Sequence, residues 1–129
     1  MQRNVSAYQQ SHVRTSSRGD LLIALYDGAI RHTYAAKVAI ERKDYAAKGQ
    51  AISGVMNIIQ ELAGTLHPHD APQLCQNLRD LYMYFIQRLR QAGLQMQAEP
   101  AVEVLGHLQN LRGTWAEAVK LARAQGHRV

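Results

Sequence analysis

The sequence predicts an all-α fold: an antiparallel four-helix bundle preceded by a short, loosely docked N-terminal segment. Apolar residues recur every three or four positions through most of the chain. Helix start and stop signals separate these repeats, and the connections between them are short. The 129 residues are 47 % hydrophobic and 19 % charged, which provides the apolar material for one core. We therefore predict a bundle over residues 17–126 and a mobile segment over residues 1–16, where apolar residues are too sparse for a helix.

The first helix is predicted from about Ser17 to Arg42. The pair Asp27-Gly28 is common in hairpin turns, but the helical period continues through it without a change of phase, so the helix should continue as well. Its core stripe steps by four and three residues through Leu22, Tyr26, Ala29, Thr33, Ala36 and Ile40. Several glycines fall inside predicted helices, and we expect four of them to permit close approach of a neighbouring helix: Gly28, Gly54, Gly106 and Gly113.

The second helix should start after Asp44, a good N-cap, and end before Pro68, because the residue preceding a proline avoids the helical region. Only one or two residues separate the first two helices, so they must lie antiparallel. Apolar residues of the second helix cover a wide arc of its surface, formed by Ile52, Val55, Met56, Ile58, Ile59 and Leu62.

Prolines mark the starts of the last two helices, because proline fits the first turn of a helix. Pro72 opens the third helix, and Pro100 opens the fourth after a break near Met96 to Glu99. The core stripe of the third helix contains Leu74, Leu78, Leu81, Phe85, Leu89 and Ala92, with Tyr82 toward its edge. That of the fourth contains Val104, Leu108, Leu111, Trp115, Ala118 and Ala122.

Composition excludes several classes of function. The net charge is +5, but no run of five or more basic residues indicates a nucleic-acid site. A lone cysteine, Cys75, excludes an internal disulfide and suits a reducing compartment. Neither a secretory signal nor a membrane-spanning run of apolar residues is present. We expect a cytoplasmic protein without stable membrane insertion and without nucleic acid as a partner.

Catalytic chemistry has no visible carrier in the sequence. No Glu-x-x-His pair of a di-iron bundle occurs, and haem, zinc and phosphate-binding motifs are missing. His67, His69 and Asp70 cluster in one connection, where a solvated loop is a better interpretation than a metal site with an incomplete set of ligands. We therefore predict a binding protein and not an enzyme, with no cofactor and no metal.

Some apolar residues exceed what one bundle core needs. Met83 and Tyr84 fall outside the stripe of the third helix, each roughly 130° from its centre on a helical wheel. Exposed methionine and tyrosine suit a surface that binds an amphipathic helix of another protein. The sequence thus predicts a partner-binding groove on the second and third helices.

Several short motifs stand in a definite order along the chain. The most distinctive is Leu25-Tyr26-Asp27-Gly28-Ala29-Ile30; the others are Ala7-Tyr8, Val13 with Thr15-Ser16, Ala39-Ile40-Glu41 with Asp44, Asn77-Leu78 with Leu81-Tyr82, and Leu111-Arg112 with Trp115, Glu117 and Ala118. In these motifs the chain resembles the flagellar secretion chaperones, the FliS family, over nearly its whole length. It departs from the family's common pattern at Ser17-Arg18-Gly19 and at His69-Asp70-Ala71-Pro72.

The resemblance implies a small cytoplasmic four-helix bundle that binds the C-terminal segment of newly made flagellin. Such a chaperone prevents premature polymerisation and keeps flagellin competent for flagellar type III export, docking at the export gate. The resemblance also implies that an N-terminal tyrosine, here Tyr8, covers part of the empty client site. An alternative is a helical adaptor or regulator that binds the amphipathic segment of another protein.

The predicted partner-binding residues combine the surplus apolar positions with those implied by the resemblance. Asp27 and Gly28 either serve the client site or shape packing inside the bundle, and the sequence is compatible with a monomer or a weak dimer. Asn77 either bonds the client's backbone or caps a local turn. The full set is Tyr8, Ile52, Val55, Ile58, Ile59, Leu62, Asn77, Leu78, Leu81, Tyr82, Met83, Tyr84 and Phe85.

Overall fold

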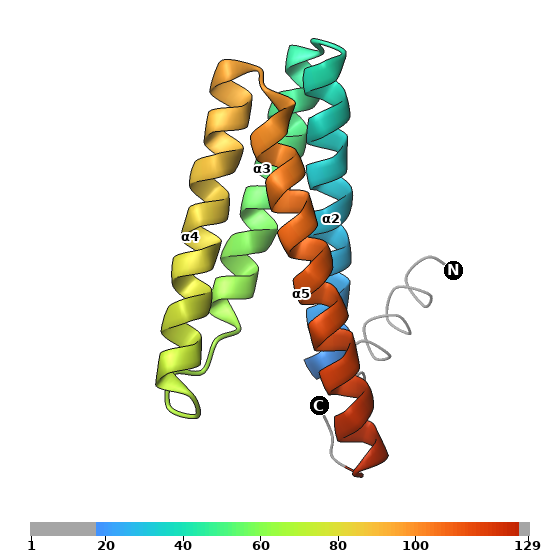
Figure 1. Ribbon diagram of the computed structural model, residues 1–129, viewed down its shortest axis with the longest axis vertical. Helices are drawn as coiled ribbons and strands as arrows, with labels where there is room; N and C mark the ends of the chain where they lie inside the picture. The colour runs from blue at the N-terminus through green and yellow to red at the C-terminus, as the bar shows by residue number, and fades with distance from the viewer. Residues whose placement is uncertain (1–17, 127–129) are drawn as a thin grey trace, which may run out of the picture.

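The computed structural model describes residues 18–126, and this part of the chain forms four long helices (Figure 1). They are α2 (Arg18–Glu41), α3 (Tyr45–Gly64), α4 (Pro72–Gln95) and α5 (Ala98–Ala124). Each helix packs beside the next, and α5 also packs along α2, which closes the bundle. The predicted all-α, four-helix architecture is confirmed, whereas the predicted N-terminal segment, residues 1–16, lies outside the described residues.

Local sequence signals set the ends of the helices. The Asp44 carboxylate caps α3 by accepting a hydrogen bond from the backbone N–H of Ala47 at 3.1 Å. Pro72 is the first residue of α4, where its missing N–H has no helical acceptor to satisfy. Pro100 lies in the first turn of α5 for the same reason. These ends fall within a residue or two of the predicted positions.

Two tight joints lie at one end of the bundle, which we call the closed end (Figure 1). Each contains a left-handed residue, Lys43 with φ 57° between α2 and α3, and Met96 with φ 50° between α4 and α5. In each joint the next backbone N–H returns to the helix: that of Asp44 donates to the Ala39 carbonyl at 2.8 Å, and that of Gln97 to the Ala92 carbonyl at 3.1 Å. These hydrogen bonds end α2 and α4, and each joint lets the chain reverse its direction within a few residues.

The opposite end, which we call the open end, contains the longer connection between α3 and α4. Figure 1 shows α4 and α5 diverging from each other toward this end. The connection spans residues 65–71, and its residues 67–70 are exposed. The bundle is therefore tight at the closed end and splayed at the open end.

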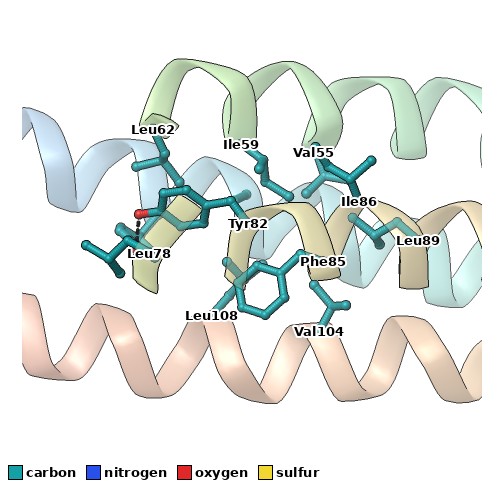
Figure 2. Packing of buried hydrophobic residues seen from close by; sticks show 12 residues of the cluster. Val55, Ile59, Leu62, Leu78, Tyr82, Phe85, Ile86, Leu89, Val104 and Leu108 are labelled. Atoms are coloured by element: carbon teal, nitrogen blue, oxygen red, sulfur yellow. Dashed lines mark hydrogen bonds between the residues drawn. The ribbon is translucent and has the colours of Figure 1, made fainter. Parts of the chain in front are cut away.

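The core is built from buried side chains of all four helices (Figure 2). Phe85, Leu89, Val55 and Ile59 are 0 % exposed, so no solvent reaches the middle of the bundle. The main cluster comprises Tyr26, Ala29, Val55, Ile59, Leu62, Leu78, Tyr82, Phe85, Ile86, Leu89, Val104 and Leu108. A smaller cluster of Ile40, Ala92 and Ala101 continues it at the closed end.

The predicted core stripe of α4 is rotated in the structure. Tyr82, placed at the edge by the sequence, is only 2 % exposed, and Ile86 is also buried. Leu74, predicted in the core, is 50 % exposed, because it lies at the start of α4 where the helices diverge. The same rotation occurs on α5, where Val119 is buried and the predicted Ala118 is exposed.

The four glycines predicted to permit close approach fall into two groups. A Cβ on Gly28 would lie 3.0 Å from Cδ1 of Ile58, and one on Gly54 would lie 2.7 Å from Nδ1 of His32, so these glycines permit close approach of α2 and α3. At Gly106 and Gly113 a Cβ would meet nothing within 4 Å among the described residues. The expectation of close packing was wrong for these two, because they lie on the outward side of α5.

Gly113→Ala is expected to raise the free energy of unfolding by about 0.5–1 kcal/mol, because alanine fits the open space and restricts the unfolded chain. Gly54→Ala, the matched change at a close approach, should lower it. Urea unfolding followed by circular dichroism gives both values. A loss of stability in Gly113→Ala would show that another part of the protein covers this position.

Candidate partner-binding surfaces

Three side chains of the motif regions form a hydrogen-bonded group inside the bundle. The hydroxyls of Tyr26 and Tyr82 lie 2.7 Å apart, and Nε1 of Trp115 donates to the Tyr26 hydroxyl at 3.2 Å. The dashed line at Tyr82 in Figure 2 marks the first of these bonds. Burial raises the pKa of both tyrosines, because a phenolate would lose its hydration in this site. Tyr26 thus joins α2 to α4 and α5 as a neutral hydrogen-bonding centre.

Asp27 and Gly28 also have partners within the bundle. The Asp27 carboxylate accepts hydrogen bonds from Nε of Arg112 at 2.8 Å and from its Nη2 at 3.4 Å, which links α2 to α5. These bonds raise the pKa of the Arg112 guanidinium. Gly28 is buried and faces Ile58 of α3. The structure therefore gives both motif residues a packing role.

A polar group centred on Glu103 closes the edge between α4 and α5. Its carboxylate accepts hydrogen bonds from the Tyr84 hydroxyl and, at 2.9 Å, from Nε of Arg88. Nε2 of His107 lies 3.3 Å away, and the His107 ring stacks on Phe85. The hydrogen bond from Tyr84 contributes most to lowering the pKa of the Glu103 carboxyl, and Arg88 lowers this pKa further. Tyr84 is 40 % exposed, but its hydroxyl is engaged within the bundle.

The predicted partner-binding residues differ in their exposure. Ile52, Ile58 and Leu81 are half-buried, Asn77, Met83 and Tyr84 are exposed, and Tyr8 lies outside the described residues. Six others are buried in the core and present no surface to a partner in this structure: Val55, Ile59, Leu62, Leu78, Tyr82 and Phe85. Their side chains instead hold the helices together. Partner binding by any member of the set stays a prediction.

The accessible members of this set do not share one face. Ile58 packs against α2, and Tyr84 faces α5. The Asn77 carboxamide accepts a hydrogen bond from the Gln73 side chain on its own helix at 2.9 Å. Ile52, Leu81 and Met83 remain, and Met83 lies on the same side of α4 as Leu94, three helical turns further along.

A groove lies between α3 and α4 near the closed end, and we call it the α3–α4 groove. It has a volume of about 350 Å³ and is lined by Lys48, Gly49, Ile52, Ser53, Leu89, Arg90, Gly93 and Leu94. Leu94 is 85 % exposed, the largest exposed fraction among the exposed large hydrophobic side chains of residues 18–126. A Cβ on Gly93 would lie 2.7 Å from Cδ1 of Ile52, so glycine allows Ile52 to lie across α4. Lys48 and Arg90 add positive charge to this apolar surface.

Sequence reasoning placed Ile52 in a partner-binding groove but missed Leu94, Lys48 and Arg90. A signal for Leu94 was present, because it follows Met83 by eleven residues and so shares its side of the helix. The two basic residues carry no such signal, since their position beside the groove depends on how α3 packs against α4.

A second depression opens between the helices at the open end, and we call it the open-end cleft. It has a volume of about 450 Å³ and is lined by Arg18, Gly19, Leu21, Leu22, Thr65, His67, Trp115, Ala118 and Val119. The sequence placed Leu22, Trp115 and Ala118 in core stripes. Leu22 and Trp115 still pack against the core cluster, but part of their surface lines this cleft.

Metal and membrane sites find no support in the described part of the chain. Among residues 18–126, no group of three or more His, Cys, Asp and Glu side chains could hold a metal ion. His67, His69 and Asp70 are exposed in the α3–α4 connection, and Cys75 is buried. The helices that span 18–124 include none that is long and apolar enough to cross a membrane.

Comparisons with known proteins agree with one another. A family model described as "Flagellar protein FliS" matches residues 1–122. The flagellar secretion chaperone FliS of Bacillus subtilis (strain 168) is 32 % identical over 127 residues, covering 98 % of this chain and 94 % of that protein. The protein of the same name from Salmonella typhimurium is 35 % identical over 129 residues, covering 96 % of each chain. That of Escherichia coli (strain K12) is 30 % identical over 122 residues, covering 91 % of this chain and 90 % of that protein.

Proposed function

Because the chain belongs to the FliS family of flagellar proteins, we propose that it is a cytoplasmic export chaperone that binds the C-terminal segment of flagellin. In this role it holds its client without catalysing a reaction, prevents premature polymerisation, and delivers flagellin to the export gate of the flagellar type III system. Its relatives bear the name flagellar secretion chaperone, which supports the general role. The alternative function is that of a helical adaptor for the amphipathic segment of another protein.

The observation that best supports binding is the α3–α4 groove. Ile52 and Leu94 offer apolar surface, and Lys48 and Arg90 flank it with positive charge. An amphipathic helix fits such a surface with its apolar side against the groove and acidic residues along its edge. Burying a side chain as exposed as Leu94 contributes roughly 1.5–3 kcal/mol before ordering costs, enough to matter for a micromolar complex.

Calorimetric titration with the C-terminal segment of the same organism's flagellin tests this proposal. We expect saturable one-to-one binding, weakened at least about tenfold by the double substitution Met83→Glu and Leu94→Glu, because two exposed contacts would become charged and unpaired. Val102→Glu is the matched control, since Val102 is 45 % exposed on α5, away from the groove. Circular dichroism establishes that each variant is folded.

The possible outcomes test the proposed client and the proposed binding site separately. Absence of binding by the folded, unsubstituted chain would reject flagellin as the client and favour the adaptor function. Binding that the double substitution leaves unchanged would keep the client but remove the α3–α4 groove from the site.

A further inference from the structure

We propose that the open-end cleft receives the C-terminal end of the bound client, with its last apolar side chain beside Trp115 and its terminal carboxylate paired with Arg18. This inference rests on the proposed function, in which a C-terminal segment is the client. It adds a second binding site at the opposite end of α3 from the α3–α4 groove, and it assigns to that site one chemical group of the client.

The apolar surface of the cleft continues the seams of the bundle. Leu22 of α2 and Trp115 of α5 extend the core stripes of their helices, and Val119 follows one turn later. Figure 1 shows α4 and α5 diverging toward this end, and no residue of α4 is among those that line the cleft. Leu21, also in the lining, remains 49 % exposed. Apolar side chains inserted here would complete a core that the helices leave unfinished.

The charge of the cleft favours an anionic group. Arg18 and His67 are the ionisable residues of its lining, and no carboxylate is among the lining residues. The nearest carboxylate in sequence, that of Asp20, pairs with Arg123 across α2 and α5. Within residues 18–126 no ion pair engages the Arg18 guanidinium, whose planar donors match a carboxylate. An apolar ligand with one carboxylate therefore suits this cleft.

A chain end satisfies these requirements better than an internal acidic residue. At the end of a polypeptide the carboxylate lies within a few bonds of the last side chains, so an apolar side chain and the carboxylate can enter together and the chain need not leave the cleft again. The position of the cleft also fits. Thr65 caps α3 and lines the cleft, while Ser53 lines the α3–α4 groove. Thr65 follows Ser53 by twelve positions, which is about 18 Å along the helix at 1.5 Å per residue, so a client segment that lies along α3 from the groove can bring its end to the cleft.

The single tryptophan of the chain provides a local readout, since Trp115 lines the cleft. We would titrate the full chain with two tryptophan-free client peptides that differ only in a C-terminal carboxylate or amide. The free acid should bind roughly fivefold more tightly, as a partly exposed charge-assisted hydrogen bond would give, and should shift the Trp115 emission to the blue. Arg18→Gln should remove this difference, whereas Arg31→Gln, an exposed charge elsewhere on α2, should preserve it.

Each alternative result overturns the proposal in a distinct way. Equal affinity of the acid and the amide would reject the carboxylate site while leaving the export-chaperone function intact. If Arg18→Gln lowered the affinity for both peptides equally, Arg18 would instead pair with an internal acidic residue of the client. Emission that shifts with protein concentration alone would assign the cleft to a second copy of the chain. If neither peptide binds, the proposed function fails and this inference fails with it.

Discussion

Phe85→Ala is expected to lower the free energy of unfolding by about 3–5 kcal/mol, the range for deleting a large aromatic side chain from a core. The Phe85 ring is 0 % exposed, and Figure 2 shows it between Val104 and Leu108 of α5. It also stacks on His107, with ring centroids 5.7 Å apart. The lost contacts therefore weaken the α4–α5 interface, and the loss is a large fraction of the stability of a small domain.

Urea unfolding measures this change, with Met83→Ala as the matched control. Met83 lies on the same helix but is 56 % exposed, so its truncation should change the free energy of unfolding by less than about 0.5 kcal/mol. Similar unfolding midpoints for the two variants would contradict the burial of Phe85 in the native protein.

Tyr26→Phe is expected to lower the free energy of unfolding by about 1–3 kcal/mol. The Tyr82 hydroxyl and the Trp115 indole N–H would then stay in the bundle without the shared partner they have now. Tyr26→Phe combined with Tyr82→Phe should cost less than the sum of the single changes, because the second change removes a group that the first leaves unpaired. A double-mutant cycle in urea measures this coupling, and strict additivity would contradict it.

The same pair predicts how stability depends on alkaline pH. Burial raises the pKa of Tyr26 and Tyr82 above the ordinary value of 10.0, so the folded state holds these protons more strongly than the unfolded state does. Their contribution is complete below about pH 10 and is lost as the pH rises above that value. Tyr82→Phe should therefore lose less stability between pH 9 and pH 11 than the unsubstituted chain does.

Local chemistry made the helices predictable from the sequence. The Asp44 cap and the prolines at 72 and 100 act within one turn, so each marks a helix end without knowledge of the rest of the fold. The joints are also local features: a joint of only a few residues forces the two helices that it connects to lie antiparallel. The stripe positions Tyr26, Phe85 and Leu108 were correctly placed in the core, because each lies near the centre of its stripe.

The properties that the sequence did not predict arise between helices. Whether Tyr82 is central or peripheral depends on the direction in which α3 and α5 flank α4, which a single helical wheel does not contain. The ion pair of Asp27 and Arg112 joins residues 85 positions apart. The open-end cleft results from the divergence of whole helices, which leaves Leu74 exposed although its spacing matches that of the buried Leu78. These positions follow from packing, and the candidate site depends on them.

The packing of α2 against α5 also determines when the protein becomes stable during its synthesis. These helices are the first and the last of the described bundle, and α5 alone spans 27 residues. Until α5 leaves the ribosome, the side of α2 that packs against α5 lacks that contact, and Tyr26 lacks its Trp115 donor. A polypeptide terminated before Ala98 would expose this apolar side permanently and become a substrate for cellular proteases. We therefore expect the chain to become resistant to proteolysis only after its last helix has been made.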